Sequence, residues 1–363
     1  MTSTIPHQRS ISAFFRGKKA LVTGHTGFKG SWLSLWFQSL GAEVFGVALA
    51  PAGSPNLYEM ARVGRGMASC IMDIRAANEL RAHLKEIQPE CVFHLAAQPL
   101  VRVSYEDAVG TFATNALGTA NLLDAVRSCP SVRAVVIVTT DKVYQNREWA
   151  HPYRESDALG GHDPYSASKA AAEIITASMR ASFFTGTPVR IATARAGNVI
   201  GGGDWATDRL VPDCLRAFSE NVPVRLRFPD AVRPWQHVLE SLAGYLALAA
   251  HLLAEKGPEY EKAWNFGPNP SDTARVGDVA DLLAALWGDS AKVIRDTGGD
   301  HPHEAGMLTL DSSAARHDLG WKPRWDLETA LQHTVDWHRA WLRGDNMHDY
   351  SLRQIEGYSR AQA

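Results

Sequence analysis

The sequence of 363 residues predicts an α/β fold that contains a doubly wound parallel β-sheet. Two observations lead to this fold class. Short apolar segments alternate with segments of helical hydrophobic spacing across residues 18–194. A glycine-rich turn joins the first apolar segment to the first helical one. In such a chain we expect helices to cover both faces of the sheet.

The individual elements follow from hydrophobic spacing and from the residues that interrupt it. Residues 18–23 form an apolar run of strand length, and residues 29–40 have helical spacing up to Gly41, which ends the helix. The same reasoning gives the other elements of the alternating pattern. The further strands are residues 43–49, 91–95, 133–139 and 189–194, and the further helices are residues 79–87, 119–127 and 166–183.

The glycine-rich turn has the spacing of a dinucleotide-binding fingerprint. Gly24 permits a tight turn, Gly27 lets backbone N–H groups approach a pyrophosphate, and Gly30 allows the helix to pack closely on the strand. A plain strand-to-helix turn is the structural alternative. The position after the first strand favours a Rossmann-type sheet that binds a dinucleotide.

The end of the second strand does not identify the dinucleotide. Residues 47–51 contain neither an acid for the adenosine ribose nor an arginine for a 2′-phosphate, so this segment leaves NAD and NADP open. Asp73 and Ile74 are expected at the adenine, although Asp73 is equally suited to capping a helix. The expected cofactor contacts are Gly24, Thr26, Gly27, Phe28, Lys29, Gly30, Asp73, Ile74, Leu95, Ala96, Ala97, Tyr165 and Lys169.

A second region begins after Asn198. From there the segments are short, interrupted by prolines and rich in tryptophan, histidine and arginine. We expect residues 17–198 to be mainly a dinucleotide-binding domain and residues 199–350 to be a smaller, mainly substrate-binding region. Because no long linker separates the two, we expect them to be interleaved.

Tyr165 and Lys169 lie one helical turn apart and predict a base for an alcohol. A phenol with a reference pKa near 10 needs a nearby cation to act as a base at neutral pH, and the Lys169 ammonium supplies one. The same ammonium is suited to hydrogen-bonding the nicotinamide ribose. A surface Tyr/Lys pair is the alternative.

Thr140, Asp141 and Lys142 follow the strand of residues 133–139 directly. Thr140 is placed to hydrogen-bond the hydroxyl that Tyr165 deprotonates, and Asp141 is suited to protonating a departing hydroxyl. A loop cap is the alternative for Asp141. Lys142 has an unperturbed pKa near 10.4 and becomes a base only if its surroundings lower that pKa. Asn115 is either a support for the site or a satisfied helix residue.

Composition excludes several classes of protein. A net charge of −2 argues against general nucleic-acid binding. Cysteines 70, 91, 129 and 214 form no CxxC pair, which favours a reducing compartment without disulfides or zinc. The N-terminus lacks a signal-like apolar stretch, and residues 242–253 are too short to span a bilayer and fit a buried helix. We expect a cytoplasmic protein that binds neither nucleic acid nor membrane.

The glycine turn and the Tyr-x-x-x-Lys pair resemble the extended short-chain dehydrogenase/reductase family, which acts on nucleotide sugars. Within it, the chain is similar to the CDP-glucose 4,6-dehydratase subgroup from about residue 17 to near the C-terminus. The segments that carry this resemblance are residues 24–32, 140–142, 160–165, 196–205, 233–238 and 301–304.

This resemblance implies a reaction with NAD that leaves the cofactor unchanged. CDP-D-glucose is oxidised at C4 with Tyr165 as base, water is eliminated across C5 and C6 with Asp141 as acid, and C6 is reduced. The products are CDP-4-dehydro-6-deoxy-D-glucose and water, for dideoxysugar or surface-polysaccharide synthesis. The dTDP-glucose dehydratases carry glutamate where this chain has Lys142, so the C5 base stays open. Val143 replaces an expected cysteine.

The resemblance also implies a diphosphate site, a cytosine site along residues 224–228, and a homodimer or homotetramer through helices of residues 111–127 and 166–183. No metal is expected, since His301 and His303 lack a further ligand set. A 4-epimerase or reductase of the same fold is the first alternative, and a non-catalytic dinucleotide-binding scaffold is the second. The expected substrate contacts are Gln98, Asn198, Arg209, Arg233, His237 and His301.

Overall fold

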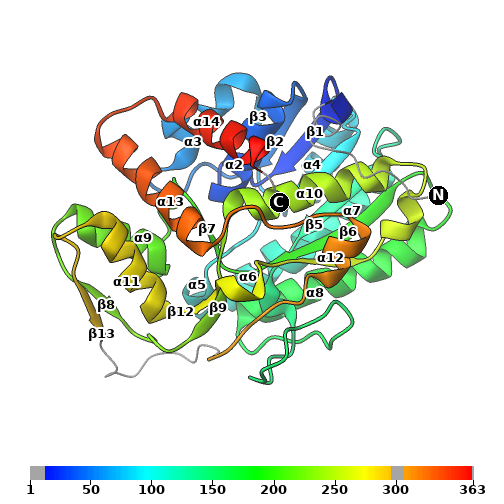
Figure 1. The fold of residues 1–363 in the computed structure, drawn as a ribbon. Coiled ribbons are helices and arrows are strands. Elements are labelled where there is room, and N and C mark those ends of the chain that lie inside the picture. The colour runs from blue at the N-terminus through cyan, green and yellow to red at the C-terminus, as the bar shows by residue number, and fades with distance from the viewer. Residues whose placement is uncertain (1–12, 296–305, 362–363) are drawn as a thin grey trace.

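A seven-stranded parallel sheet forms the centre of the computed structural model, which describes residues 13–295 and 306–361 (Figure 1). The strand order is β3-β2-β1-β4-β5-β6-β11, with the reversal beside β1 that the doubly wound fold predicts. The fold class predicted from the sequence is therefore confirmed. The strands are β1 Lys19–Thr23, β2 Glu43–Ala48, β3 Ala68–Ile71, β4 Cys91–His94, β5 Ala134–Val138, β6 Arg190–Ala196 and β11 Ala263–Phe266.

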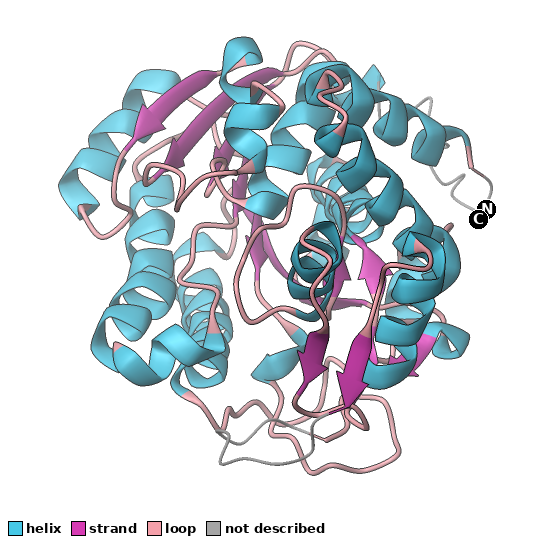
Figure 2. Ribbon diagram, turned by 90° about the vertical axis from the view of Figure 1, so that its left-hand side faces the viewer, coloured by secondary structure: helices cyan, strands magenta, loops and turns pink. Residues whose placement is uncertain are grey.

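Helices from the first half of the chain cover one face of the sheet, and Figure 2 shows helices surrounding the strands. Their leucines and valines pack with inward-facing residues of β4, β5 and β6 in one core. A π-helical turn, Ala113–Leu117, joins two of these helices into one rod, and a second π-helical turn, Arg180–Phe184, extends the last. The helices are α4 Ala77–Ile87, α6 Ala108–Phe112, α7 Gly118–Arg127 and α8 Pro164–Met179.

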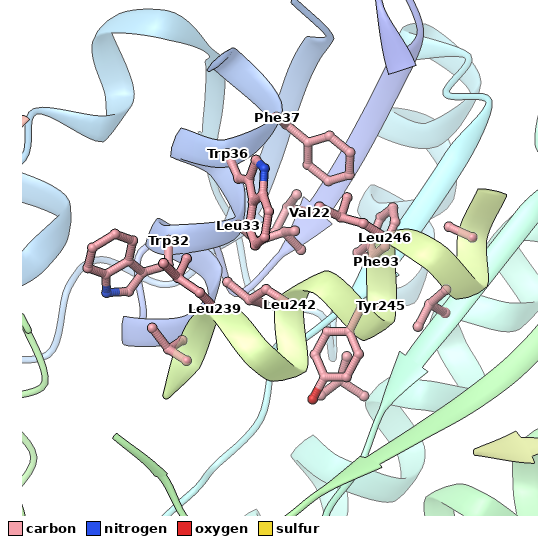
Figure 3. Packing of buried hydrophobic residues seen from close by; sticks show 14 of the residues in the cluster. Val22, Trp32, Leu33, Trp36, Phe37, Phe93, Leu239, Leu242, Tyr245 and Leu246 are labelled. Carbon is pink, nitrogen blue, oxygen red and sulfur yellow. The ribbon is translucent and has the colours of Figure 1, made fainter. Parts of the chain in front are cut away.

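The opposite face carries α2 (Phe28–Ser39), α10 (Val238–Leu253) and α14 (Met347–Arg360). Figure 3 shows side chains of α2 and α10 meeting over Val22 of β1 and Phe93 of β4. Burying each such large apolar side chain contributes about 1.5–3 kcal/mol, so this layer anchors the helix that begins at the glycine turn. The labelled residues from the two helices are Trp32, Leu33, Trp36, Phe37, Leu239, Leu242, Tyr245 and Leu246.

A second, smaller core lies beside the sheet and is built from α9 (Leu210–Ser219), α11 (Val276–Trp287) and α13 (Leu327–Leu342). Three short two-stranded sheets connect it to the rest, pairing β7 with β10, β8 with β13 and β9 with β12. Their bounds are β7 Val199–Ile200, β8 Val224–Leu226, β9 Val232–Pro234, β10 Gln236–His237, β12 Thr273–Arg275 and β13 Val293–Arg295. The remaining elements are α3 Leu57–Met60, η1 Val63–Gly66, α5 Val101–Glu106, η3 Asp141–Val143, η5 Gly257–Tyr260, η6 Pro270–Asp272 and α12 Ser313–Asp318.

The chain crosses between the two parts more than once. After the second core begins at α9, the chain returns to the sheet with α10 and adds β11 beside β6. The sequence predicts α10 as a buried helix, and it is buried on nearly all sides. Within residues 13–295 and 306–361, no helix combines the length and the apolar character that crossing a bilayer requires.

Candidate active site

A large cleft runs along the carboxyl edge of the sheet, between the sheet and the second core. Its volume is about 1820 Å³, and it is lined by the glycine turn, by the residues after β2, β4, β5 and β6, and by the segment before α9. The carboxyl edge near the strand-order reversal is where open α/β sheets bind ligands. Most site residues expected from the sequence line this cleft.

The glycine turn allows contacts that a side chain would prevent. Gly24 has φ +75°, and a Cβ there would lie 2.7 Å from the backbone nitrogen of Ala96. A Cβ on Gly30 would lie 2.0 Å from the Gly24 carbonyl oxygen. Gly27 differs, because a Cβ there would meet only that oxygen, at 3.4 Å, and the space in front of it is open. Packing therefore requires glycine at positions 24 and 30, whereas Gly27 leaves room for a ligand.

The N-terminus of α2 fits the pyrophosphate of a dinucleotide. No side chain among the described residues caps this end, and the first turn holds no acidic residue. Its free N–H groups and the positive end of the helix dipole are therefore available to an anion. Leu49 and Ile74 line the same cleft and offer apolar surface to a nucleobase.

Asp73 and Thr26 have partners that the sequence does not predict. The Asp73 carboxylate accepts hydrogen bonds from the Arg75 guanidinium, at 2.6 Å from Nη2, and this interaction lowers the pKa of Asp73. Asp73 does not cap α4, whose N-cap residue is Ala76. The Thr26 hydroxyl donates to the Leu49 carbonyl at 2.9 Å, which fixes the glycine turn against the end of β2.

Lys29 is half-buried, lines the cleft and contacts α10. Its Nζ donates to the Tyr245 hydroxyl at 3.4 Å. Burial, helped by the positive charges of Arg209 and Lys169, lowers the pKa of Lys29 to about 7, although Asp141 and Asp204 act in the opposite sense. The pKa of this lysine of the glycine turn therefore depends on the charges of Lys169, Asp141 and Arg209.

Tyr165 and Lys169 both lie at the cleft, on the first two turns of α8. Burial raises the pKa of Tyr165 to about 12, while a hydrogen bond with Thr140 and the charge of Arg209 lower it. Burial lowers the pKa of Lys169 to about 8, opposed by the carboxylate of Glu173, and its Nζ donates to the Val138 carbonyl at 3.1 Å. Arg209 is thus a cation that acts on the phenol, a role that the sequence assigns to Lys169.

Thr140 and Asp141 form a hydrogen-bonded pair at the end of β5. The Thr140 hydroxyl donates to Asp141 Oδ1 at 2.9 Å. Asp141 is 1% exposed, and its Oδ2 has no hydrogen-bond partner among the described residues. Thr140 rather than Asp141 caps the following turn, by accepting from the Lys142 N–H at 3.4 Å. Lys142 is half-buried and lines the cleft.

Arginines and aspartates gather where the cleft meets the second core. Arg209 Nη1 lies 2.8 Å from Asp204 Oδ2, an interaction that raises the pKa of Arg209. Asp208 forms ion pairs with two arginines, since its Oδ1 lies 3.1 Å from Arg102 Nη1 and 2.8 Å from Arg227 Nη1. Asn198 and Arg233 line the same part of the cleft, and Asn198 Oδ1 has no partner among the described residues.

Two of the expected substrate contacts, Gln98 and His237, do not line the cleft. The Gln98 side chain bonds Leu100 in its own loop and Thr111 of α6. His237 is fully buried, with its ring 4.8 Å from that of Trp325, because it begins the core helix α10. His301 lies outside the described residues.

The sequence did not predict a buried hydrogen-bond network around Glu173. Glu173, two turns after Tyr165 on α8, accepts hydrogen bonds from Thr139 and from Arg195. The signal was present, since residues 165, 169 and 173 repeat at the four-residue spacing of one helix face. Asn115 supports the same helix, because its Nδ2 donates to Ser168 Oγ at 2.8 Å and to the Gln98 carbonyl at 3.0 Å.

No group of three or more potential metal ligands occurs within the part of the chain that the structure describes. The cleft brings together a phenol, a carboxyl group and several cations. These groups surround a glycine turn with room for a dinucleotide.

Structural comparison places the same fold in nucleotide-sugar enzymes. A Thermus thermophilus UDP-glucose 4-epimerase in complex with NAD is 25% identical, with a TM-score of 0.75, covering 88% of this chain and 99% of that one. A double mutant of the Streptomyces venezuelae dTDP-glucose 4,6-dehydratase with bound NAD is 23% identical, with a TM-score of 0.76, covering 88% and 96%. Epimerases and dehydratases share this architecture, so the fold alone does not distinguish them.

Sequence comparison is more specific. The CDP-glucose 4,6-dehydratase of Salmonella typhimurium is 50% identical over 353 residues, which cover 96% of this chain and 98% of that protein. The family model described as GDP-mannose 4,6-dehydratase matches residues 21–334. The chain belongs to the GDP-mannose 4,6-dehydratase family.

Proposed function

We propose that this protein is an NAD-dependent CDP-glucose 4,6-dehydratase, a carbon–oxygen lyase. It converts CDP-D-glucose to CDP-4-dehydro-6-deoxy-D-glucose and water, through oxidation at C4, elimination across C5 and C6, and reduction at C6. One observation carries the proposal: a buried carboxyl group, Asp141, lies in the same cleft as the Tyr165 phenol and has one oxygen without a partner among the described residues. Simple oxidation or epimerisation at C4 needs the phenol but not this acid.

The residues of the glycine turn would hold NAD. Gly24, Gly27 and Gly30 shape the turn, and the uncapped N-terminus of α2 would bind the pyrophosphate. Leu49 and Ile74 would cover the adenine, and Leu95–Ala97 would follow the dinucleotide across the end of β4. When bound, NAD supplies the acceptor for the hydride of C4 and the donor of that hydride to C6.

Tyr165 would take the proton of the C4 hydroxyl. Three groups favour its phenolate, namely the Thr140 hydroxyl, the Arg209 guanidinium and, once a nicotinamide ribose is held, the Lys169 ammonium. Burial outweighs the threonine and the arginine and raises the pKa of Tyr165 to about 12, which leaves little phenolate at neutral pH. The cleft therefore needs these partners for turnover at neutral pH.

Asp141 and Lys142 would carry the elimination. Once C4 is a ketone, the C5 proton is acidified, and Lys142, half-buried at the cleft, is placed to take or relay it. Asp141 would protonate the hydroxyl that leaves C6. A buried carboxyl that donates to a leaving group contributes about 10²- to 10⁴-fold in rate.

The nucleotide would lie toward the second core. Asn198, Arg209 and Arg233 would contact the diphosphate, for which a guanidinium offers paired hydrogen bonds. Strand β8 and Phe228 would hold the cytosine. Residues 17–198 would then mainly serve the dinucleotide and residues 199–350 mainly the nucleotide sugar, with the two regions interleaved.

The protein would work in the cytoplasm as a homodimer or homotetramer. The four cysteines are free thiols, as a reducing compartment maintains. Apolar side chains are exposed along the rods that contain α6, α7 and α8, and a second copy would cover them. These side chains are Val109, Phe112, Leu117, Ile174 and Phe183.

The function is tested by incubating the purified protein with NAD and, separately, CDP-, dTDP-, UDP- and GDP-glucose. We expect a 4-keto-6-deoxy product from CDP-glucose with the highest kcat/KM. Formation of a C4 epimer would instead indicate an epimerase, and net formation of NADH would indicate a dehydrogenase. Full turnover by Tyr165→Phe would indicate that the phenol is not the base.

A further inference from the structure

Two arginines converge on one carboxylate oxygen in the cleft. Arg102 Nη1 lies 3.1 Å from Asp208 Oδ1, and Arg227 Nη1 lies 2.8 Å from the same oxygen. All three residues line the cleft, and their side chains are 29–40% exposed, so a ligand in the cleft can reach them. Two positive charges therefore share a single negative charge at a position that a ligand can occupy.

The two arginines come from different parts of the fold. Arg102 lies on α5, which follows β4 of the central sheet and packs against α8. Arg227 directly follows β8, whose apolar side chains belong to the second core. Asp208 lies between β7 and α9, outside any helix or strand. A group held by both arginines would thus contact the sheet side and the second core at once, as is expected of a substrate bound between them.

The arrangement leaves positive charge and N–H donors available. Each guanidinium has five N–H groups, and among the described residues Asp208 provides the ion-pair partner of both arginines and no second carboxylate joins them. Exposed ion pairs contribute little to stability, so a ligand with more negative charge can replace the carboxylate at modest cost. Phosphate suits a guanidinium because its oxygens accept paired hydrogen bonds. The two arginines therefore have the chemistry of a phosphate site.

We propose that Arg102 and Arg227 bind the diphosphate of the nucleotide sugar, and that the Asp208 carboxylate competes with the diphosphate for both guanidiniums. This rests on the function proposed above and adds two arginines to the diphosphate contacts named there. As an internal competitor, Asp208 weakens the binding of substrate and product alike. Because product release limits the turnover of many enzymes, this competition favours turnover.

The position of the site favours the nucleotide sugar over the cofactor as the source of the phosphate. The pyrophosphate of NAD has its own place at the N-terminus of α2, beside the glycine turn. Arg227 instead lies between β8 and Phe228, which would hold the cytosine, and Asp208 directly precedes Arg209 in the chain. The diphosphate joins the cytidine to the sugar, so it passes between the cytosine site and the reacting centre.

A structural clasp is the alternative role for the same ion pairs. In that case the pairs would hold α5 and the second core together, and Asp208 would keep the arginines in place for the ligand. The two roles predict opposite effects when the charge of Asp208 is removed. Loss of a competitor strengthens diphosphate binding, whereas loss of a clasp weakens it.

The first test is isothermal titration calorimetry of Asp208→Asn with NAD, and with CDP and cytidine in the presence of NAD. The substitution suits the site, because asparagine readily adopts the left-handed backbone that Asp208 has at φ +62°. We expect CDP to bind about 3- to 10-fold more tightly than to wild type, the equivalent of two exposed ion pairs. Cytidine and NAD should bind as they do to wild type. Weaker or unchanged CDP binding would overturn the competition, and an equal or larger gain for NAD would overturn the assignment to the nucleotide sugar.

A double-mutant cycle separates competition from a general change of charge. Arg102→Met combined with Arg227→Met should weaken CDP binding by about 10- to 100-fold, as expected for the loss of charged hydrogen bonds. Adding Asp208→Asn to this protein should give no gain. If Asp208→Asn strengthens CDP binding by the same factor with and without the arginines, the competition is wrong. Wild-type CDP affinity in the double arginine variant would remove both arginines from the diphosphate site.

Asp345→Asn is the matched control for net charge. Asp345 pairs with the exposed Arg343 at 2.9 Å, and neither residue lines the cleft. The affinity of this variant for CDP should stay within about 2-fold of the wild-type value. A gain as large as that of Asp208→Asn would show that net charge alone accounts for the effect, which would overturn the competition.

A crystal structure of the wild-type protein with CDP needs no variant. We expect a phosphate oxygen bonded to Arg102 and Arg227, and the Asp208 carboxylate separated from at least one of them. Both ion pairs intact, with the diphosphate bound elsewhere, would overturn the proposal even if the variants fail to fold. The proposed function fails separately. If Asp208→Asn binds CDP more tightly but the wild-type protein forms no 4-keto-6-deoxy product, the phosphate site stands and the dehydratase does not.

Discussion

Arg195 and Glu173 form a two-pronged ion pair directly beneath the reacting centre. Arg195 Nη2 lies 2.9 Å from Glu173 Oε2, Nε lies 2.9 Å from Oε1, and both side chains are at most 4% exposed. Glu173 also accepts from Thr139 at 2.5 Å and from Thr193 at 2.7 Å. The pair ties the helix of Tyr165 and Lys169 to the ends of β5 and β6.

Glu173→Gln should destabilise the protein by about 3–5 kcal/mol, because it leaves the Arg195 charge buried without its counter-ion. Guanidinium denaturation at neutral pH measures this change. The double variant Glu173→Leu with Arg195→Met removes both charges and should recover most of the loss. A free energy of unfolding for Glu173→Gln within about 1 kcal/mol of the wild-type value, which is about the error of the comparison, would contradict this expectation. The pair would then not hold the helix.

Lys169→Met should raise stability at pH 7 while removing turnover. Burial lowers the pKa of Lys169 from 10.5 to about 8, against the effect of Glu173. Between pH 8 and pH 10.5 the unfolded chain binds more protons than the folded protein does. The destabilising effect of Lys169 is therefore complete below about pH 8 and fades as the pH rises toward 10.5. The gain should reach up to about 3 kcal/mol at pH 7 and shrink by pH 10.

Thermal or chemical denaturation of the Lys169→Met protein at both pH values checks this expectation. Lys262→Met serves as the control, since Lys262 is an exposed lysine paired with Asp318, and its effect should stay within about 0.5 kcal/mol. If the Lys169→Met protein is less stable than wild type at pH 7, the surroundings of the ammonium offset the free-energy cost of burying its charge.

Lys142→Ala should reduce the exchange of the C5 hydrogen with solvent deuterium. Lys142 lines the cleft beside Asp141, and no other residue of the triplet is suited to accept a carbon-bound proton. We expect exchange into the product to fall by about 100-fold, the size of a general-base contribution. Proton NMR of the product formed in D₂O gives the measurement. Unchanged exchange would assign the C5 base to another residue.

Ile174→Lys on α8 should weaken self-association. Ile174 is 59% exposed on a helix whose neighbours α6 and α7 also expose apolar side chains, and a charge there would be buried by a second copy. Light scattering should shift toward the 39.7 kDa monomer. Leu342→Lys on α13 is the matched control, at 50% exposure outside these helices. Equal masses for wild type and Ile174→Lys would place any interface elsewhere.

The sequence predicts the first half of the fold well because its strands are short apolar runs separated by periodic helices. It does not predict that β11 joins the same sheet, since the apolar pattern of a strand indicates burial and does not identify the neighbouring strand. The predicted helix of residues 119–127 likewise begins earlier, as part of a rod from Ala108. Long-range pairing accounts for the first difference, and the π-helical turn Ala113–Leu117, which joins α6 to α7, accounts for the second.

The site shows the same division between local and long-range information. The motif spacing identifies Gly24, Tyr165 and Lys169 at the cleft, because each is fixed by its own strand or helix. The influence of Arg209 on Tyr165 links residues 44 positions apart, and no local pattern encodes it. The sequence does not predict the core position of His237 for a similar reason. Spacing along the chain does not distinguish a buried histidine from one that lines a cleft.

The pairing of β11 with β6 constrains how the chain can be divided. A fragment that ended at residue 198 would leave the backbone of β6 as an open sheet edge, because β11 supplies its hydrogen bonds on that side. It would also remove α10 and expose the apolar surface of α2 and β1 that Figure 3 shows covered. Such a fragment would aggregate, so this enzyme cannot be reduced to a minimal cofactor-binding unit.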